Sequence, residues 1–468
     1  MQPTSPARTP APTLHRGRPV RVAVIGGGAA GLAAAHRLLA EPGLEVTVLE
    51  AERMLGGLAS WFPIGGEYLE RYHHFLCTGD REYLRVAAEL GLGHALRWRR
   101  VRMGYFYEGR RYDFGSPWDL LRFPHLSVTE KLRVARAVHR IKSRPREAWR
   151  ECADRAVVPW LRETFGDRAY EILHEPLLTG KFGAYREHLS AAWMWARMHR
   201  VGKSHSRWLH REIYGYLEGG SYRLLETLAN RVRERRGRIE VDARVDEIAV
   251  AGDGRVEGVR LRGVREPFDA VISTVPFQLL RRALPRVEEP YFHALDRVEY
   301  FGVTCWVART RRPLTKHFWL NINDPRISIP GIIEYTNLNP LPHLAGDRLL
   351  YVPQYLDPRD PRFGWDDDAY HRRYVAHLGI IEPSFGERDV VEWHVFRTTH
   401  AQPLCNLGFE RMIPSMRTPL AGLYVTDSYL LQPDDRTISN SLRMGRDAAE
   451  LLLEDVSSGR PSGGAAVA

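Results

Sequence analysis

A glycine-rich turn near the start of the chain constrains the fold more than any other feature of this sequence. Residues 20–25 (VRVAVI) form a short apolar run rich in β-branched side chains, and the turn GGGAAG at 26–31 follows it directly. An Ala- and Leu-rich segment then runs to Leu39, and a second apolar run, 45–49 (EVTVL), is followed by Glu50. This order of strand, glycine turn, helix, strand and acid predicts a dinucleotide-binding βαβ unit.

The residues of this turn are of the types that pyrophosphate binding requires. Gly26 permits the tight turn, Gly28 lets the backbone approach the anion, and Gly31 lets the helix pack closely on the strand. Ala30 lies in the same turn, where the helix N-terminus offers free N–H groups. Glu50 is placed to accept hydrogen bonds from a ribose diol, and its charge disfavours the 2′-phosphate of NADP. We therefore expect all five residues to bind a dinucleotide.

A glycine doublet beyond the acid indicates which dinucleotide. Gly56 and Gly57 are followed by Leu58, and an ordinary NAD fingerprint lacks this doublet. Residues 22–60 resemble the FAD-binding N-terminus of the flavin-containing amine oxidase superfamily, which includes protoporphyrinogen oxidases, phytoene desaturases and, more distantly, UDP-galactopyranose mutases. The resemblance implies that FAD is the cofactor and that the doublet lies along its pyrophosphate. Amine oxidases proper usually carry Arg at the position of Leu58, so this residue is more similar to the desaturase and mutase branches.

The C-terminal region resembles the same superfamily. Residues 422–427 (GLYVTD) are expected to form a strand ending in an acid, and a helix is expected over 438–454. In the family the acid binds the ribityl or pyrophosphate region, and the helix directs its N-terminus at the flavin pyrimidine. The residues that match these positions are Asp427 and the backbone at Ser441, Leu442 and Arg443. The run SNSLRMG at 439–445 replaces the Ala-x-x-Ser-Gly of amine oxidases, which argues against amine oxidation as the specific reaction.

A β-rich insert between these two regions completes the resemblance. The sequence GGS at 219–221 opens a predicted helix, and 238–241, 245–250 and 269–274 are expected to form strands. In the family this insert contributes backbone contacts to adenine. Val245 matches that position, so the resemblance implies that it binds the cofactor.

Long stretches of helix-rich and mixed pattern separate the three FAD segments. We therefore predict an α/β fold in which a Rossmann-like FAD-binding domain is interleaved with a mixed α+β substrate domain. The FAD-binding domain is expected at 18–80, 212–280 and 400–456, and the substrate domain at 81–211, which is helix-rich, and at 281–399. Residues 1–17 and 457–468 have the composition of disordered extensions.

Two histidines are candidates for contact with the substrate. His73 and His74 stand where relatives carry an acid or a histidine near the isoalloxazine, and either could orient a substrate or act as acid or base. The alternative is a pair of structural histidines beside an aromatic cluster. We expect no metal site, because adjacent side chains of a strand point to opposite faces and no third ligand is evident.

Three further candidates lie later in the chain. Lys181 belongs to 174–183, which resembles the loop before the substrate-roof helices of protoporphyrinogen oxidase-like proteins. It could meet an anionic group, and an exposed lysine without a role is the alternative. Arg397 and Gln402 precede the closing motif, where relatives place residues that flank the substrate face of the flavin.

The charge of the chain bears on its partners. It has 67 Lys and Arg against 57 Asp and Glu, a formal surplus of ten positive charges. A helix predicted over 129–150 is densely basic and carries an apolar stripe, so it could rest on an anionic membrane or attract an acidic substrate, and a solvated basic face is the alternative. No nucleic-acid motif accompanies it, so nucleic-acid binding is not expected. Four separated cysteines and no apolar window long enough for a membrane span indicate a cytoplasmic protein with reduced thiols.

These features together favour a FAD-dependent oxidoreductase. We expect hydride transfer from a substrate C–H bond to flavin N5, as in an oxidase, dehydrogenase or desaturase, and the charge favours an anionic substrate. One alternative is a redox-neutral flavoenzyme that resembles UDP-galactopyranose mutase and acts on a nucleotide sugar. A second is a flavin-binding protein without turnover.

Overall fold

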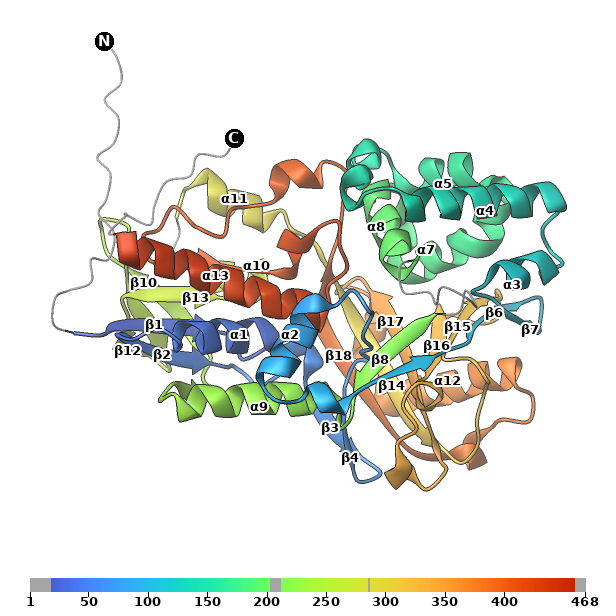
Figure 1. The fold of residues 1–468 in the computed structure, drawn as a ribbon, viewed down its shortest axis with the longest axis horizontal. Coiled ribbons are helices and arrows are strands. Elements are labelled where there is room, and N and C mark those ends of the chain that lie inside the picture. The colour runs from blue at the N-terminus through green and yellow to red at the C-terminus, as the bar shows by residue number, and fades with distance from the viewer. Residues whose placement is uncertain (1–17, 203–211, 285–286, 459–468) are drawn as a thin grey trace, which may run out of the picture.

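A five-stranded parallel sheet forms the centre of one half of the molecule, at the left in Figure 1. The computed structural model describes residues 18–202, 212–284 and 287–458. In spatial order the strands are β19 (Leu423–Val425), β13 (Ala270–Ser273), β1 (Val20–Ile25), β2 (Leu44–Leu49) and β9 (Arg238–Glu240), and every neighbouring pair is parallel. Because segments far apart in the sequence supply these strands, the sheet confirms the predicted Rossmann-like, interleaved fold.

Both faces of this sheet are buried. One face shares a core with the helices α1 (Ala29–Leu38), α9 (Gly220–Glu234) and α13 (Ile438–Ser458). The other face packs against the antiparallel strands β10 (Val245–Val250) and β11 (Val256–Leu261) and the helices α10 (Phe277–Ala283) and α11 (Pro290–Asp296), and the largely exposed β12 (Val264–Pro267) pairs with β11. Burial on both faces explains why β1 is apolar at every position except the half-buried Arg21, without polar alternation.

A seven-stranded mixed sheet forms the other half. Its spatial order is β18 (Val390–Pro403), β14 (Tyr300–Thr310), β17 (Arg348–Leu356), β16 (Gly331–Glu334), β15 (Trp319–Asn323), β6 (Met103–Tyr107) and β7 (Arg110–Asp113). Only β15 and β6 pair in parallel. Helix α12 (Asp367–Ile381) covers one face, and the hairpin β3 (Trp61–Ile64) and β4 (Glu67–Glu70) packs on the other.

Helices form a lobe beside this sheet, at the upper right of Figure 1. They are α3 (Pro117–Arg122), α4 (Val128–Ser143), α5 (Val157–Phe165), α6 (Asp167–Ala169), a π-helical turn (Tyr170–His174), α7 (Glu175–Phe182) and α8 (Ala191–Gly202). Helix α2 (Arg81–Glu89) and the paired strands β5 (Leu96–Arg100) and β8 (Ile213–Leu217) connect the two halves. The lobe shares one core with β14, through Phe301, and with the chain after β18.

Three expected element boundaries are wrong. The basic helix expected over 129–150 ends at Ser143, since Pro145 disfavours helical backbone in the residue before it. The segment 174–183 is helical and not a loop, because Pro176 lies in the first turn of α7, where a missing N–H costs nothing. Helix α13 extends to Ser458, past the expected end at 454 and into the expected tail. Residues 1–17 and 459–468 lie outside the described residues.

No helix of the described residues is long and apolar enough to cross a membrane. The six domain boundaries placed from the sequence remain a prediction.

Candidate active site

The glycine turn and the glycine doublet form one backbone ledge at the N-terminus of α1. Gly28 and Gly56 pair as a parallel bridge, and the N–H of Gly56 donates to the carbonyl oxygen of Gly27 at 2.9 Å. A Cβ on Gly31 would lie 1.8 Å from the carbonyl oxygen of Gly26, so only glycine fits there. Gly57 has a φ of +55° and is exposed beside Gly28, and half-buried Leu58 follows it. The ledge therefore presents bare backbone where a pyrophosphate would lie.

Glu50 lies at the carboxyl end of β2, beside this ledge. Its Oε2 accepts from the N–H of Gly27 at 2.7 Å, and its Oε1 accepts from the N–H of Glu52 at 2.9 Å. Burial raises the pKa of Glu50, and the two N–H groups oppose that shift. The N–H of Ala243 donates to the carbonyl oxygen of Glu50 at 2.8 Å, which places Val245, at the start of β10, in the neighbouring segment.

Asp427 follows β19 at the same edge of the sheet. It is buried, and its Oδ1 accepts from the N–H of Tyr429 at 2.6 Å. Burial raises the pKa of Asp427 to about 7. The buried hydroxyls of Ser273 and Thr426, at the ends of β13 and β19, have no hydrogen-bond partner among the described residues. These unpaired polar groups gather at the carboxyl edge, where parallel sheets bind ligands.

The start of α13 differs in detail from the expectation. The N–H of Ser441 donates to the carbonyl oxygen of Thr437 at 2.9 Å, and the Leu442 side chain is fully buried against α1. The N–H groups that a helix leaves unpaired therefore precede Ser441. Arg443 is half-buried and pairs with Asp447 at 3.5 Å, within its own helix. The ledge, the edge carboxylates and this helix terminus together fit a flavin dinucleotide.

His73 and His74 lie in a segment between β4 and α2 that is not a strand, contrary to the expectation. The His73 ring stands edge-on to Trp319, with 5.2 Å between ring centroids. Burial lowers the pKa of His73 well below its usual range, and positive charge from Arg436 adds to that shift. Burial also lowers the pKa of His74, against the effect of Glu70. Both rings are therefore neutral at pH 7.

Neither of these histidines forms part of a metal site in the described chain. No group of three or more His, Cys, Asp or Glu side chains lies within reach of one ion there. The Nδ1 atoms of His73 and His74 are buried and have no hydrogen-bond partner among the described residues. Each can therefore exchange a hydrogen bond or a proton with a bound molecule.

Lys181 is buried, not exposed. The side chain, on α7, is 8% exposed, and its Nζ lies 4.6 Å from the ring centroid of Tyr355 and 4.9 Å from that of Trp193. Burial lowers the pKa of Lys181 well below its usual range, and the charge of Arg197 adds to the effect.

Sequence reasoning missed several charged residues around Lys181. They are Arg197 and Arg200 on α8, Asp435 and Arg436 before α13, and Asp80 before α2. Arg197 lies 3.3 Å from Asp435, and Arg200 lies 3.3 Å from Asp80. The sequence held part of this signal, because Arg197 and Arg200 stand three apart on a largely apolar helix and so share one face.

Arg397 and Gln402 lie on β18 in different surroundings. Arg397 donates to the carbonyl oxygen of Trp365 at 2.8 Å and pairs with Asp367 at 2.7 Å, so its side chain joins β18 to the start of α12. The buried Nε of Arg397 has no hydrogen-bond partner among the described residues, and the expected role of Arg397 beside the flavin stays a prediction. Gln402 is buried, and its Oε1 has no hydrogen-bond partner among the described residues, so it remains a candidate.

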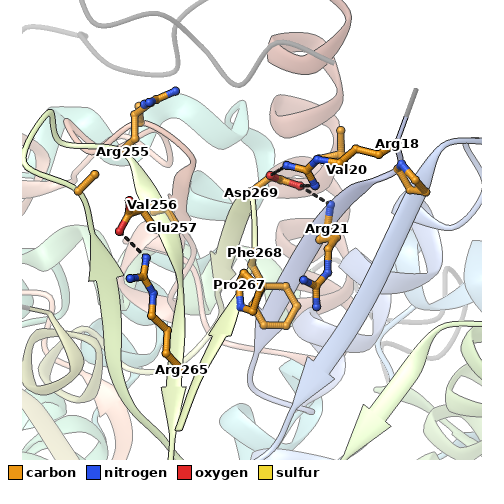
Figure 2. A pocket seen from close by; sticks show the side chains of 13 residues that line it. Arg18, Val20, Arg21, Arg255, Val256, Glu257, Arg265, Pro267, Phe268 and Asp269 are labelled. Atoms are coloured by element: carbon orange, nitrogen blue, oxygen red, sulfur yellow. Dashed lines mark hydrogen bonds and ion pairs between the residues drawn. The ribbon is translucent and has the colours of Figure 1, made fainter. Parts of the chain in front are cut away.

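A hollow of about 530 Å³ lies at the opposite, amino edge of the parallel sheet (Figure 2). Its charged side chains are largely paired with one another: Arg18 donates to Asp269 at 3.0 Å, and Arg265 pairs with Glu257. Because it is remote from the ledge and its charges are compensated, this hollow is not the functional site.

Comparisons with known proteins support the interpretation that the glycine ledge binds a flavin dinucleotide. The family model described as flavin containing amine oxidoreductase matches residues 29–453. The 15-cis-phytoene desaturase of Arabidopsis thaliana is 22% identical over 94% of this chain and 81% of its own.

Solved structures with the same fold come from several kinds of flavoprotein. A proposed protoporphyrinogen oxidase from Exiguobacterium sp. 255-15 superposes with a TM-score of 0.72 at 19% identity, covering 93% of this chain and 99% of that one. A reduced UDP-galactopyranose mutase superposes with a TM-score of 0.70 at 14% identity, covering 93% of this chain and 96% of that one. At these identities the likeness establishes the fold alone.

Proposed function

The chain belongs to the flavin containing amine oxidoreductase family, and from this premise we propose that it removes a hydride from a C–H bond of a small-molecule substrate. It is a FAD-dependent oxidoreductase. FAD, when bound, supplies the isoalloxazine N5 as hydride acceptor. The observation that carries the proposal is that the helical lobe meets the segment before α13, since Arg197 on α8 pairs with Asp435, and that the charge of Arg436 in this segment acts on His73.

In this proposal the residues of the chain bind and orient the two reactants. Gly28, Gly56 and Gly57 receive the pyrophosphate, Glu50 receives the ribose, and Asp427 lies at the flavin end of the sheet edge. Neutral His73 or His74 can accept a proton from a substrate O–H or N–H as the hydride leaves the adjacent carbon. Burial of this segment between the two halves keeps water away from the reacting bond.

Anaerobic titration of the yellow holoprotein tests the reaction. We expect that an oxidisable substrate alone bleaches the visible flavin absorbance, and that heat or acid then releases FAD from the denatured protein. Candidate alcohols, amines and polyprenoid compounds are screened by this readout. If none bleaches the flavin, and turnover of a nucleotide sugar appears only after dithionite reduction, the hydride proposal is wrong and the redox-neutral alternative is right.

The mutase-like alternative is kept because of one observation. Basic side chains line the interior beside His73, and such charges suit a nucleotide diphosphate as well as a smaller anion. The alternative without turnover is dropped, because the family is one of enzymes.

We also propose that the substrate is anionic. The net surplus of ten positive charges and the basic interior support this. The four cysteines are buried and form no disulfide in the described chain, which supports the expected reducing, cytoplasmic compartment.

Peripheral contact with an anionic membrane is a further part of the proposal, and the outer face of α3 and α4 supports it. Trp118, Leu121, Val128 and Leu132 are 65%, 56%, 68% and 49% exposed. Exposed Arg122, Arg136 and Arg140 lie on the same two helices. An exposed apolar face bordered by arginines suits the surface of an anionic bilayer.

Vesicle sedimentation tests this contact. We expect the holoprotein to sediment with phosphatidylcholine vesicles that contain phosphatidylglycerol and to stay in solution with pure phosphatidylcholine. The double variant Trp118→Ser, Leu121→Ser should lose most of the bound fraction. The control Val264→Ser removes a side chain that is 66% exposed on β12, and it should bind as the wild type does. If the double variant bound the vesicles as well as Val264→Ser does, the proposed membrane contact would be wrong.

A further inference from the structure

Four basic side chains gather where the helical lobe meets the start of α13. They are Lys181 on α7, Arg197 and Arg200 on α8, and Arg436 in the segment before α13. Among the described residues, two carboxylates form ion pairs with them, Asp435 with Arg197 and Asp80 with Arg200, each at 3.3 Å. This cationic cluster therefore carries a surplus of positive charge inside the molecule.

Lys181 and Arg436 are the members that form no ion pair with a described carboxylate, although the charge of Asp435 acts on both. Lys181 is 8% exposed, and in the described chain no group accepts a hydrogen bond from its Nζ or forms an ion pair with it. Its contacts are the rings of Tyr355, Trp193 and Phe182, at 4.6–5.3 Å. Arg436 donates to the hydroxyl of Tyr355 at 3.1 Å and is in no ion pair with a described carboxylate. Burial lowers the pKa of Lys181 against the effect of Asp435, so an anion bound beside Lys181 would favour its protonated form.

A neutral donor also lies unpaired in this cluster. Trp193 is 2% exposed, and its Nε1 has no hydrogen-bond partner among the described residues, although the Lys181 Nζ lies over its ring. An indole N–H and a guanidinium can only donate hydrogen bonds, and the same holds for Lys181 when it is protonated. The missing partner is therefore an acceptor, and the surplus of charge requires an anion.

The cluster faces the predicted substrate side of the site. The charges of Arg436, Arg197 and Lys181 all act on His73, and that of Arg436 also acts on His74. Arg436 stands two residues before α13. An anion held by these groups would therefore lie between the helical lobe and the histidines, away from the pyrophosphate ledge.

We propose that Lys181, Arg197 and Arg436 form a subsite that binds an anionic oxygen group of the ligand, a carboxylate or a phosphate, beside His73. The subsite deepens the proposed function and rests on it for the identification of its occupant as the substrate. The planar guanidinium groups of Arg197 and Arg436 can each donate two parallel hydrogen bonds to such a group. The amino group of Lys181, which lies among aromatic rings, adds a single positive charge.

Calorimetric titration of the oxidised holoprotein with inorganic pyrophosphate and with benzoate tests this subsite. We expect at least one of the two to bind, and we expect the visible flavin spectrum to change on binding. Pyrophosphate as the tighter ligand would indicate a phosphate group in the substrate, and benzoate a carboxylate. Lys181→Gln should weaken the binding by about 10-fold to 100-fold, the loss of one charged hydrogen bond. Arg436→Gln should act in the same direction.

The choice of variants keeps the test independent of folding. Neither substitution leaves a carboxylate unpaired, so both proteins should purify yellow with a melting temperature near that of the wild type. The control Lys316→Gln removes a surface lysine paired with Asp113 at 2.9 Å, and it should not change anion binding. Failure of the wild type to bind either anion, or unchanged binding by yellow Lys181→Gln, would overturn the subsite.

The outcomes separate this inference from the proposed function. Bleaching by a neutral substrate without any anion binding would remove the subsite and leave hydride transfer in place. Anion binding that depends on Lys181 in a protein that no substrate bleaches would retain the subsite and remove hydride transfer.

Discussion

The variant Gly57→Asp should fold and fail to retain FAD. Gly57 has a φ of +55°, a left-handed conformation that aspartate tolerates better than most residues. A Cβ there would lie 3.5 Å from the Cα of Gly28, an ordinary contact, so the backbone ledge survives. The new carboxylate would stand beside the N-terminus of α1, where the pyrophosphate has to bind.

Charge repulsion makes the expected effect large. Two like charges about 4 Å apart, at an effective dielectric constant of about 20, repel by about 4 kcal/mol. This corresponds to about a 1000-fold weaker Kd for FAD. The ratio of visible to ultraviolet absorbance after purification measures retention, reconstitution with added FAD measures the Kd, and circular dichroism checks the fold.

Two matched controls isolate the cause. Gly57→Asn has nearly the same shape without the charge, so it should retain far more FAD than Gly57→Asp. Gly43→Asp introduces the same carboxylate at a φ of +81° with no atom within 4 Å, in the turn after α1, and it should stay yellow. A yellow Gly57→Asp protein, or colourless variants at all three substitutions, would mean that the doublet does not receive the pyrophosphate.

The parallel sheet could be predicted because its signals are local. The β1 strand spans the predicted residues 20–25, and Gly31 and Glu50 stand at the spacing that a helix and a strand impose between turn and acid. A strand buried on both faces has to be apolar along most of its length, and a ledge for an anion has to lack side chains. Each requirement can therefore be recognised from the residue types of one short segment of sequence.

The interior of the site could be predicted only in part, because it is assembled from distant segments. Lys181 and Arg436 are 255 positions apart in the sequence and meet at Tyr355. No local pattern distinguishes Lys181 from a surface lysine, since Gly180 and Gly183 on either side suggest an exposed loop. Packing against Trp193 and Phe182 overrides that local tendency. The ion pair of Arg397 with Asp367 could not be predicted for a related reason, because this acidic partner belongs to a helix elsewhere in the sequence.

The role of Gly445 likewise cannot be predicted from its local sequence. From the sequence it is one glycine within a helix, and in the structure it is where α13 crosses α1. A Cβ on Gly445 would lie 1.9 Å from the carbonyl oxygen of Ala30 and 2.6 Å from its carbonyl carbon. Ala30 belongs to the first turn of α1, directly beside the glycine turn that forms the ledge. The close crossing therefore fixes the position of the helix terminus that the cofactor needs.

Gly445→Ala should consequently reduce both stability and FAD affinity. Backbone atoms cannot rotate away as a side chain can, so the two helices have to separate, and such overpacking costs roughly 1–3 kcal/mol. Alanine is intrinsically the better helix former by roughly 0.5–1 kcal/mol, which offsets only part of this cost. Thermal unfolding of the apo-protein measures the first effect, and titration with FAD measures the second.

The matched control is the same substitution in another helix. Gly379 lies in α12, and a Cβ there would meet its nearest atom, the carbonyl oxygen of Phe385, at 3.5 Å. Gly379→Ala should therefore leave FAD binding unchanged and raise the free energy of unfolding by roughly 0.5–1 kcal/mol. If both alanines raise the melting temperature, helix propensity outweighs the contact at Ala30, and the crossing of α13 over α1 does not hold the FAD ledge in place. If Gly445→Ala alone lowers both quantities, the contact between the first and last helices of the fold is what aligns the N-terminus of α1 with the pyrophosphate.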